Sequence, residues 1–182
     1  MSIQTLDKLL ICHIDCSIWS GRKKLRPEDF RLANGSQLPP KDVASLGSKK
    51  ICDPEALANF ERLKKEAQRL CEQVGVRFLG GYAVPEDRID QIVPELDRIG
   101  QEFAQCKQLF LDNYDQVTFD WVAKHPEFAD AIRRALSPIE DVEQRLQFDY
   151  AIYRMQPAVQ AGGLDDKVNG MGHTLFREVA RD

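Results

Sequence analysis

Two successive stretches with apolar residues at alternating spacings of three and four most constrain the fold of this chain. The first covers residues 56–74 and the second covers residues 89–121. This spacing places the apolar side chains on one stripe of a helix, as in the seam of a coiled coil. Because the two stretches follow each other directly, they predict a long antiparallel helical hairpin with coiled-coil-like seams.

Local signals mark the ends of these predicted helices. Asp53 and Pro54 favour a helix start, since the carboxylate accepts a backbone hydrogen bond and proline at the first helical position sacrifices no needed donor. Gly75 favours the end of the first helix. Pro94 lies inside the second stretch and predicts a kink or a break there, because its ring clashes with the carbonyl four residues earlier. A second helix continuing to Lys124 would extend ~60 Å, so part of it is expected to pack on something else.

Two segments alternate between polar and apolar residues, as strands do. In residues 10–18 the alternation predicts a strand with one buried face, and residues 147–155 predict a second strand that pairs with the first. We therefore expect a mostly α fold with a small two-stranded β element, of the α+β class. Residues 1–182 are predicted to form a single domain, with a helical hairpin arm at 53–125 packed on a small base of residues 1–52 and 126–182. The chain stops without a helix-ending signal, so we expect it to be the N-terminal part of a longer protein.

The segment between the two apolar stretches, residues 76–84, is too apolar for a solvated loop and too rich in glycine for a helix. It predicts a buried, extended connection in which glycine permits close backbone approach. A second interpretation fits equally well, in which the tip of the hairpin docks a partner. The residues of that candidate docking segment are Phe78, Leu79, Gly80, Gly81 and Tyr82.

Charge points to a local patch. The net charge of -4 argues against a protein that binds polyanions with its whole surface. Two basic runs flanked by a tryptophan form a candidate patch that could hold nucleic-acid phosphates or an acidic protein surface. Charged turns of this kind are usually only solvated, and that interpretation is somewhat favoured. Neither run has the spacing of a phosphate-binding loop, so nucleotide hydrolysis is not expected. The candidate patch comprises Arg22, Lys23, Lys24, Arg26, Lys49, Lys50 and Trp19.

The cysteines and histidines do not form a convincing site. The 5 cysteines are widely spaced and odd in number, which favours reduced thiols in the cytoplasm over a disulfide framework. No stretch has the pattern of a signal peptide or a membrane span. On a strand, Cys12 and Cys16 would lie ~13 Å apart, too far to share a metal. His13 and Asp15 share the opposite face, where a metal-dependent enzyme is conceivable, but a solvated strand face is the favoured interpretation. We expect no catalytic residue, no metal and no cofactor.

Four motifs resemble an uncharacterised bacterial family, domain of unknown function 3150. They are IWSGRKKL at residues 18–25, SLGSKK at 45–50, DPEAL at 53–57 and GVRFLGGYAVP at 75–85. The resemblance implies that this protein is encoded on a bacterial mobile element. It also implies that the genes beside its own encode MoxR-like AAA+ ATPases and von Willebrand A-domain proteins. We accordingly expect a non-enzymatic adaptor that docks such a protein partner through its helical hairpin. The alternative is a nucleic-acid-binding accessory factor that uses the basic patch. Nothing in the sequence predicts the oligomeric state.

Overall fold

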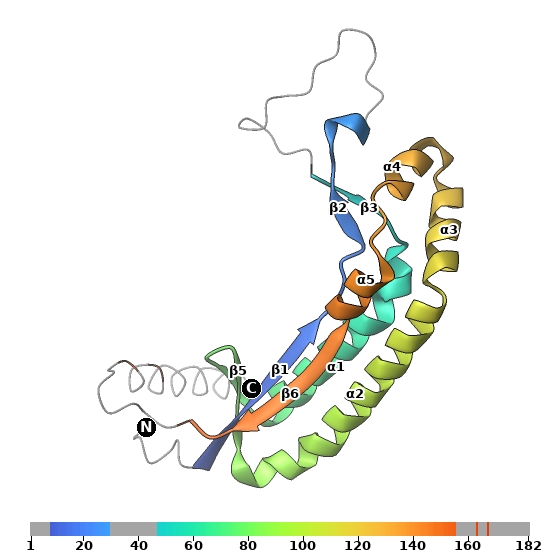
Figure 1. Cartoon of the computed structure of the whole chain (residues 1–182). Coiled ribbons are helices and arrows are strands. Elements are labelled where there is room, and N and C mark those ends of the chain that lie inside the picture. The colour runs from blue at the N-terminus through green and yellow to red at the C-terminus, as the bar shows by residue number, and fades with distance from the viewer. Residues whose placement is uncertain (1–7, 30–46, 156–162, 164–166, 168–182) are drawn as a thin grey trace. The chain divides into compact units, whose positions relative to one another are not determined.

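The computed structural model describes residues 8–29, 47–155, 163 and 167, and within them the fold is α+β (Figure 1). The described helices are α1 (Ala58–Val74), α2 (Ile89–Asp112), α3 (Tyr114–Lys124), α4 (Ala129–Arg133) and α5 (Ile139–Arg145), with short 3-10 turns at Pro27–Asp29, Pro54–Leu57, Glu86–Arg88 and Pro126–Phe128. The described strands are β1 (Leu9–Ser17), β2 (Arg22–Lys24), β3 (Ser48–Lys50), β4 (Val76–Phe78), β5 (Gly81–Pro85) and β6 (Gln147–Tyr153). None of these helices is long and apolar enough to cross a membrane.

The described residues form two compact units. The first takes in the described parts of residues 1–16, 62–104 and 148–182, and the second takes in those of 17–61 and 105–147. Neither unit coincides with the predicted arm at 53–125, because the boundary between the units falls within both long helices.

A four-stranded sheet with the order β4-β5-β1-β6 organises the first unit. Strand β5 pairs antiparallel with both β4 and β1, and β6 lies along the other side of β1 (Figure 1). The predicted pairing of the two alternating segments is therefore confirmed. The sheet is larger than the predicted two-stranded element, since two of its strands come from the connection between the helices.

The predicted long helical hairpin is wrong. Residues 76–85 do not form a simple loop between two helices but the antiparallel strands β4 and β5. The apolar stripes of the helices face the sheet: the Cys71 Sγ of α1 lies 3.7 Å from the Cys12 Sγ of β1, and the Phe103 ring of α2 lies 5.7 Å from that of Phe148 on β6. A spacing of three and four shows that a helix has one apolar stripe, and it does not show whether a helix or a sheet covers that stripe.

Glycines allow the segment between α1 and α2 to pack closely against neighbouring backbone. A Cβ atom on Gly75 would lie 2.5 Å from the carbonyl oxygen of Ala83, and one on Gly81 would lie 2.9 Å from the carbonyl oxygen of Cys12. The predicted end of the first helix and the predicted close backbone approach are both confirmed. The second helix runs through Pro94 without a break, and the interruption falls instead at Asn113, between α2 and α3.

Strand β1 is buried on both faces at Ile11 and Cys12, whereas the alternation predicted only one buried face. Cys12 is buried, as predicted, and it faces α1. Ile11, on the opposite face, is also buried and packs with Phe78 and Ala83. The sheet therefore carries a second apolar cluster that the alternating pattern did not indicate.

Aromatic rings form the core of the second unit. Trp19 lies 5.8 Å from Tyr114 and 6.2 Å from Phe110, measured between ring centroids, and Phe60 packs edge-on against Phe110 at 6.0 Å. Asp53 accepts a hydrogen bond from the backbone N–H of Glu55 at 3.1 Å, as the predicted helix start requires. The two-stranded sheet of β2 and β3 also belongs to this unit.

Candidate functional site

The antiparallel strands β2 and β3 bring the two basic runs of the sequence together. Arg22 lies opposite Lys50, Lys23 opposite Lys49, and Lys24 opposite Ser48. We call this two-stranded sheet the basic ribbon. Two of its three cross-strand pairs join like charges, an arrangement that destabilises a sheet unless an anion offsets it.

Backbone hydrogen bonds and two glycines extend the pairing at both ends of the basic ribbon. The N–H of Ile51 donates to the carbonyl of Gly21 at 2.8 Å, and that of Leu25 donates to the carbonyl of Gly47 at 3.1 Å. Gly21 and Gly47 have φ angles of 59° and 76°, in the left-handed region that favours glycine. The Gly-Arg-Lys-Lys and Gly-Ser-Lys-Lys runs are thus the two halves of one local structure.

A nearly buried ion pair anchors the ribbon. The Lys49 ammonium lies 2.5 Å from the carboxylate of Asp29, and their side chains are 13% and 5% exposed. The carboxylate also accepts a hydrogen bond from the Arg26 backbone N–H at 2.8 Å. Burial acts to raise the pKa of Asp29, but these two hydrogen bonds and the positive charges of Lys49 and Arg134 outweigh it and hold the pKa below its usual value.

Five cationic side chains converge on a pocket of about 670 Å³ beside the ribbon. We call it the basic pocket, and Asp29 is the one carboxylate among the described residues that line it. Arg134 was not part of the predicted patch, because it follows α4, far along the chain from the other cations. Its only signal in the sequence is the Arg133-Arg134 doublet. The lining residues are Lys23, Lys24, Arg26, Asp29, Lys49, Arg134, Ala135 and Leu136.

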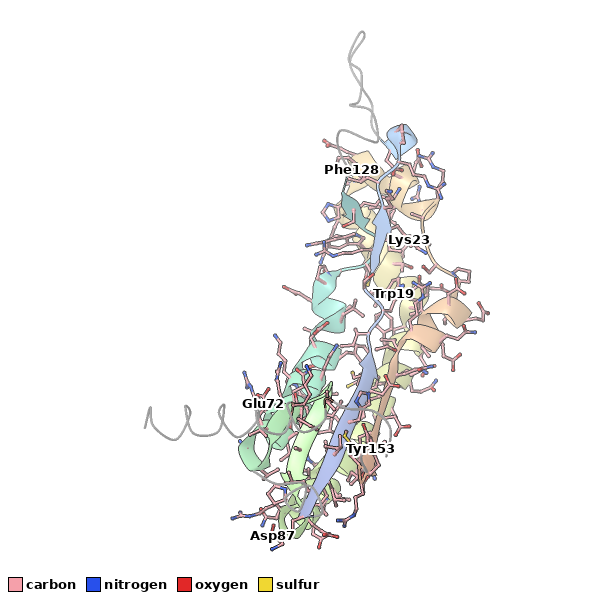
Figure 2. All side chains as sticks on the ribbon, turned by 90° about the vertical axis from the view of Figure 1, so that its left-hand side faces the viewer. Trp19, Lys23, Glu72, Asp87, Phe128 and Tyr153 are labelled. Carbon is pink, nitrogen blue, oxygen red and sulfur yellow. The ribbon has the colours of Figure 1, made fainter. Side chains whose placement is uncertain are left out.

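A second pocket of about 330 Å³ adjoins the basic pocket, since Asp29 and Lys49 line both. We call it the aromatic pocket. Its rings come from Trp121, His125 and Phe128 (Figure 2 labels Phe128 and Lys23), and Phe128 is 56% exposed. The remaining lining residues are Leu25, Ser48, Lys50, Ala131 and Ile132.

Two contacts hold the rings of the aromatic pocket in place. The indole N–H of Trp121 donates to the backbone carbonyl of Lys50 at 3.2 Å, which ties α3 to β3. The rings of Trp121 and His125 meet edge-on with centroids 4.3 Å apart. The pocket thus has an oriented aromatic wall next to a concentration of positive charge.

The family model described as "Protein of unknown function (DUF3150)" matches residues 6–182. The chain belongs to the DUF3150 family. This confirms the resemblance seen in the four sequence motifs. No curated protein and no solved structure matches the chain. The basic ribbon and both pockets lie within the DUF3150 match, so they are part of the family domain itself.

Trp19 does not belong to the surface of the basic patch of this DUF3150 domain. Its side chain is 1% exposed, and it packs among the aromatic rings of the core. A buried indole cannot stack on a ligand. The aromatic residue that flanks the ribbon is Trp121, which the sequence did not single out because it lies far from the basic runs.

The predicted docking segment is mostly core. Phe78, Gly81 and Tyr82 are buried within the DUF3150 sheet, in β4 and β5. Leu79 and Gly80 form the turn between these strands, and Leu79 is 53% exposed with a φ angle of 46°. These positions agree better with the buried connection, the other interpretation of this segment, than with a docking surface.

Among the described residues, the candidate metal residues on β1 gather no further ligands. Cys12 lies against Cys71, while the half-buried His13 and the exposed Asp15 lie elsewhere on the strand. Within the described part of this DUF3150 chain, no three or more His, Cys, Asp or Glu side chains are grouped as a metal ion would need. The basic ribbon and its two pockets are therefore the strongest candidate site.

Proposed function

We propose that this protein binds nucleic acid through the phosphates, using the basic ribbon and the basic pocket. The observation that carries the proposal is the convergence of five cations from separate parts of the chain on one pocket, where Asp29 is the sole carboxylate among the described lining residues. Phosphate oxygens are good acceptors for lysine and arginine donors. A phosphate in the basic pocket would also lie beside Lys23 and Lys49, one of the two like-charged pairs across the ribbon, and would add to the offset that Asp29 gives there.

The distribution of charge supports a local rather than a general electrostatic attraction. The whole chain carries a net charge of -4, so the cations of the site stand out against an acidic background. Asp29 engages Lys49, and Lys23, Lys24 and Arg134 are the other lining cations that we expect a phosphate to contact. Binding of this kind depends steeply on salt, because it releases counterions from the nucleic acid.

The test is binding of a fluorescently labelled oligonucleotide, followed by anisotropy over a range of salt concentrations. The Lys23→Glu/Lys24→Glu variant should bind more weakly, and the slope of log affinity against log salt should fall by about 0.7–0.9 for each phosphate that the variant no longer neutralises. Lys49 is left unchanged, since a carboxylate there would face the nearly buried Asp29. A wild-type protein that binds no oligonucleotide, or binds it without salt dependence, would contradict the proposal.

The matched control reverses two charges outside the site. Lys65 and Arg69 are exposed and lie one turn apart on α1. The Lys65→Glu/Arg69→Glu variant has the same net charge as the ribbon variant. Equal weakening by both variants would show a general charge effect and no specific site.

A protein partner is the second candidate function. The residues to test as its contact surface are Leu109 on α2 and Phe119 on α3, each of them 64% exposed. The family resemblance makes an AAA+ ATPase or a von Willebrand A-domain protein the partner to test.

We expect co-purification from the native operon to weaken in a Leu109→Asp/Phe119→Asp variant. This function would be excluded if none of the proteins encoded by the neighbouring genes co-purified with the wild-type protein.

A further inference from the structure

We infer that the aromatic pocket receives an unpaired base, so that the nucleic acid bound by this protein is single-stranded. This inference rests on the proposed function and names its substrate class. It starts from the adjacency of two pockets with different chemistry. The basic pocket gathers cations and the aromatic pocket gathers rings, and Asp29 and Lys49 line both.

Single strands are bound by this combination of chemistries. A positively charged groove follows the backbone, and aromatic side chains stack on the bases. In a duplex the bases are already stacked on each other, and removing one from the stack carries an energetic penalty. A phosphate in the basic pocket would therefore place the neighbouring base of a single strand, but not of a duplex, at the aromatic pocket.

The geometry of the aromatic pocket suits a planar ring. Its volume of about 330 Å³ lies at the lower end of the ~300–1,000 Å³ found for pockets that hold small organic ligands. The hydrogen bond from Trp121 to the Lys50 carbonyl sets the orientation of the indole before any ligand binds. Phe128 presents an exposed ring at the same pocket, where stacking would cover it. Stacking accepts any base, so we expect little sequence preference.

The charge at the rim favours a nucleic acid over an apolar peptide as the occupant. Lys50 of β3 lines the aromatic pocket together with the Lys49–Asp29 ion pair, and the other cations of the basic pocket adjoin it. An occupant must therefore carry an apolar ring and negative charge within a short distance of each other. A nucleotide unit of a single strand has both.

The experiment compares three labelled ligands of equal length: a single strand, the duplex of the same sequence, and a single strand whose sugars carry no bases. The wild-type protein should bind the single strand more tightly than the other two. Phe128→Ala should weaken binding of the single strand roughly 5-fold or more, the loss expected for one stacked base, and leave the abasic strand unaffected. DNA and RNA versions of each ligand distinguish the two sources of unpaired bases.

Tyr153→Ala is the matched control, because Tyr153 is an exposed aromatic residue on β6 that lines neither pocket. It should leave all three affinities unchanged. Equal affinity for the three ligands, together with no effect of Phe128→Ala, would overturn the inference. If that binding still depended on salt, the proposed function would stand. Absence of binding to every ligand would overturn both. Both would also be overturned if the protein bound a peptide of alternating Glu and Phe but none of the nucleic-acid ligands.

Discussion

Asp29 is the carboxylate around which the cations of the basic pocket are arranged. It accepts hydrogen bonds from the Lys49 ammonium and from the Arg26 backbone, and its pKa is lower than that of an ordinary aspartate. A lowered pKa in the folded state means that Asp29 stabilises the fold at every pH above its unfolded pKa of about 3.9. That contribution disappears as the pH falls through the folded pKa.

Asp29→Asn should therefore have opposite effects on stability and on binding. Near pH 7 the variant should be less stable by about 1–3 kcal/mol, since Lys49 is left without its charged partner in a nearly buried position. This deficit should shrink as the pH falls below about 4, where the wild type also loses this contribution. Urea unfolding at both pH values measures it, and an equal deficit at both would contradict the assignment. Affinity for oligonucleotides should rise, because the negative charge of Asp29 is removed from the pocket.

Single residues differed in how far the sequence revealed their roles. The roles of Asp53 and Gly75 could be predicted because they depend on neighbours within a few residues. Those of Trp19 and Arg134 could not. Trp19 adjoins a basic run in the sequence but packs in the core, and Arg134 reaches the basic pocket only through the fold. Local signals therefore identified most of the cations of the site and none of its aromatic rings.

Among the elements, the basic ribbon combines local pairing with repulsion. Its strands are only three residues long, and Arg22 and Lys50 lie directly opposite each other with both residues exposed. Like charges in this position oppose the pairing that holds the strands together. Such a balance is typical of sites where function is maintained at some expense of stability.

Arg22→Glu tests this balance. The substitution converts a like-charge pair into an opposite-charge pair and should stabilise the fold by about 0.2–1 kcal/mol, while it weakens oligonucleotide binding. Thermal denaturation and anisotropy together measure the two effects. Lys65→Glu on α1 is the control for a general change of charge. A variant that is less stable than both the wild type and this control would show that the repulsion across the ribbon is not significant.

The sequence predicted some elements well and others poorly, for a physical reason. Alternation located β1 and β6 and their pairing, and the apolar stripes located α1 and α2. Strands β4 and β5 were interpreted only as an extended connection, because β4 has only three residues and β5 is buried at four consecutive positions, so neither shows an alternating pattern. That omission produced the wrong hairpin. Without β4 and β5 the predicted sheet was too small to pack against both helices, so the helices were predicted to pack against each other.

At the scale of the whole molecule, both compact units are built from segments that lie far apart in the sequence. The predicted arm was one continuous stretch of the sequence, and the predicted base was two. The pattern within one stretch does not indicate which distant stretch will pack against its apolar face. The net charge of -4 likewise describes the whole chain and conceals the basic pocket. The candidate site could thus be predicted as two basic runs, but its pockets could not.

The shared wall of the two pockets provides a route for thermodynamic linkage between them. Lys49 and Asp29 line both, so any ligand that draws the Lys49 ammonium away from Asp29 changes both pockets at once. If occupancy of the basic pocket alters affinity at the aromatic pocket by some factor, occupancy of the aromatic pocket must alter affinity at the basic pocket by the same factor. The contributions of the two pockets to the affinity for one ligand are then cooperative and not simply additive.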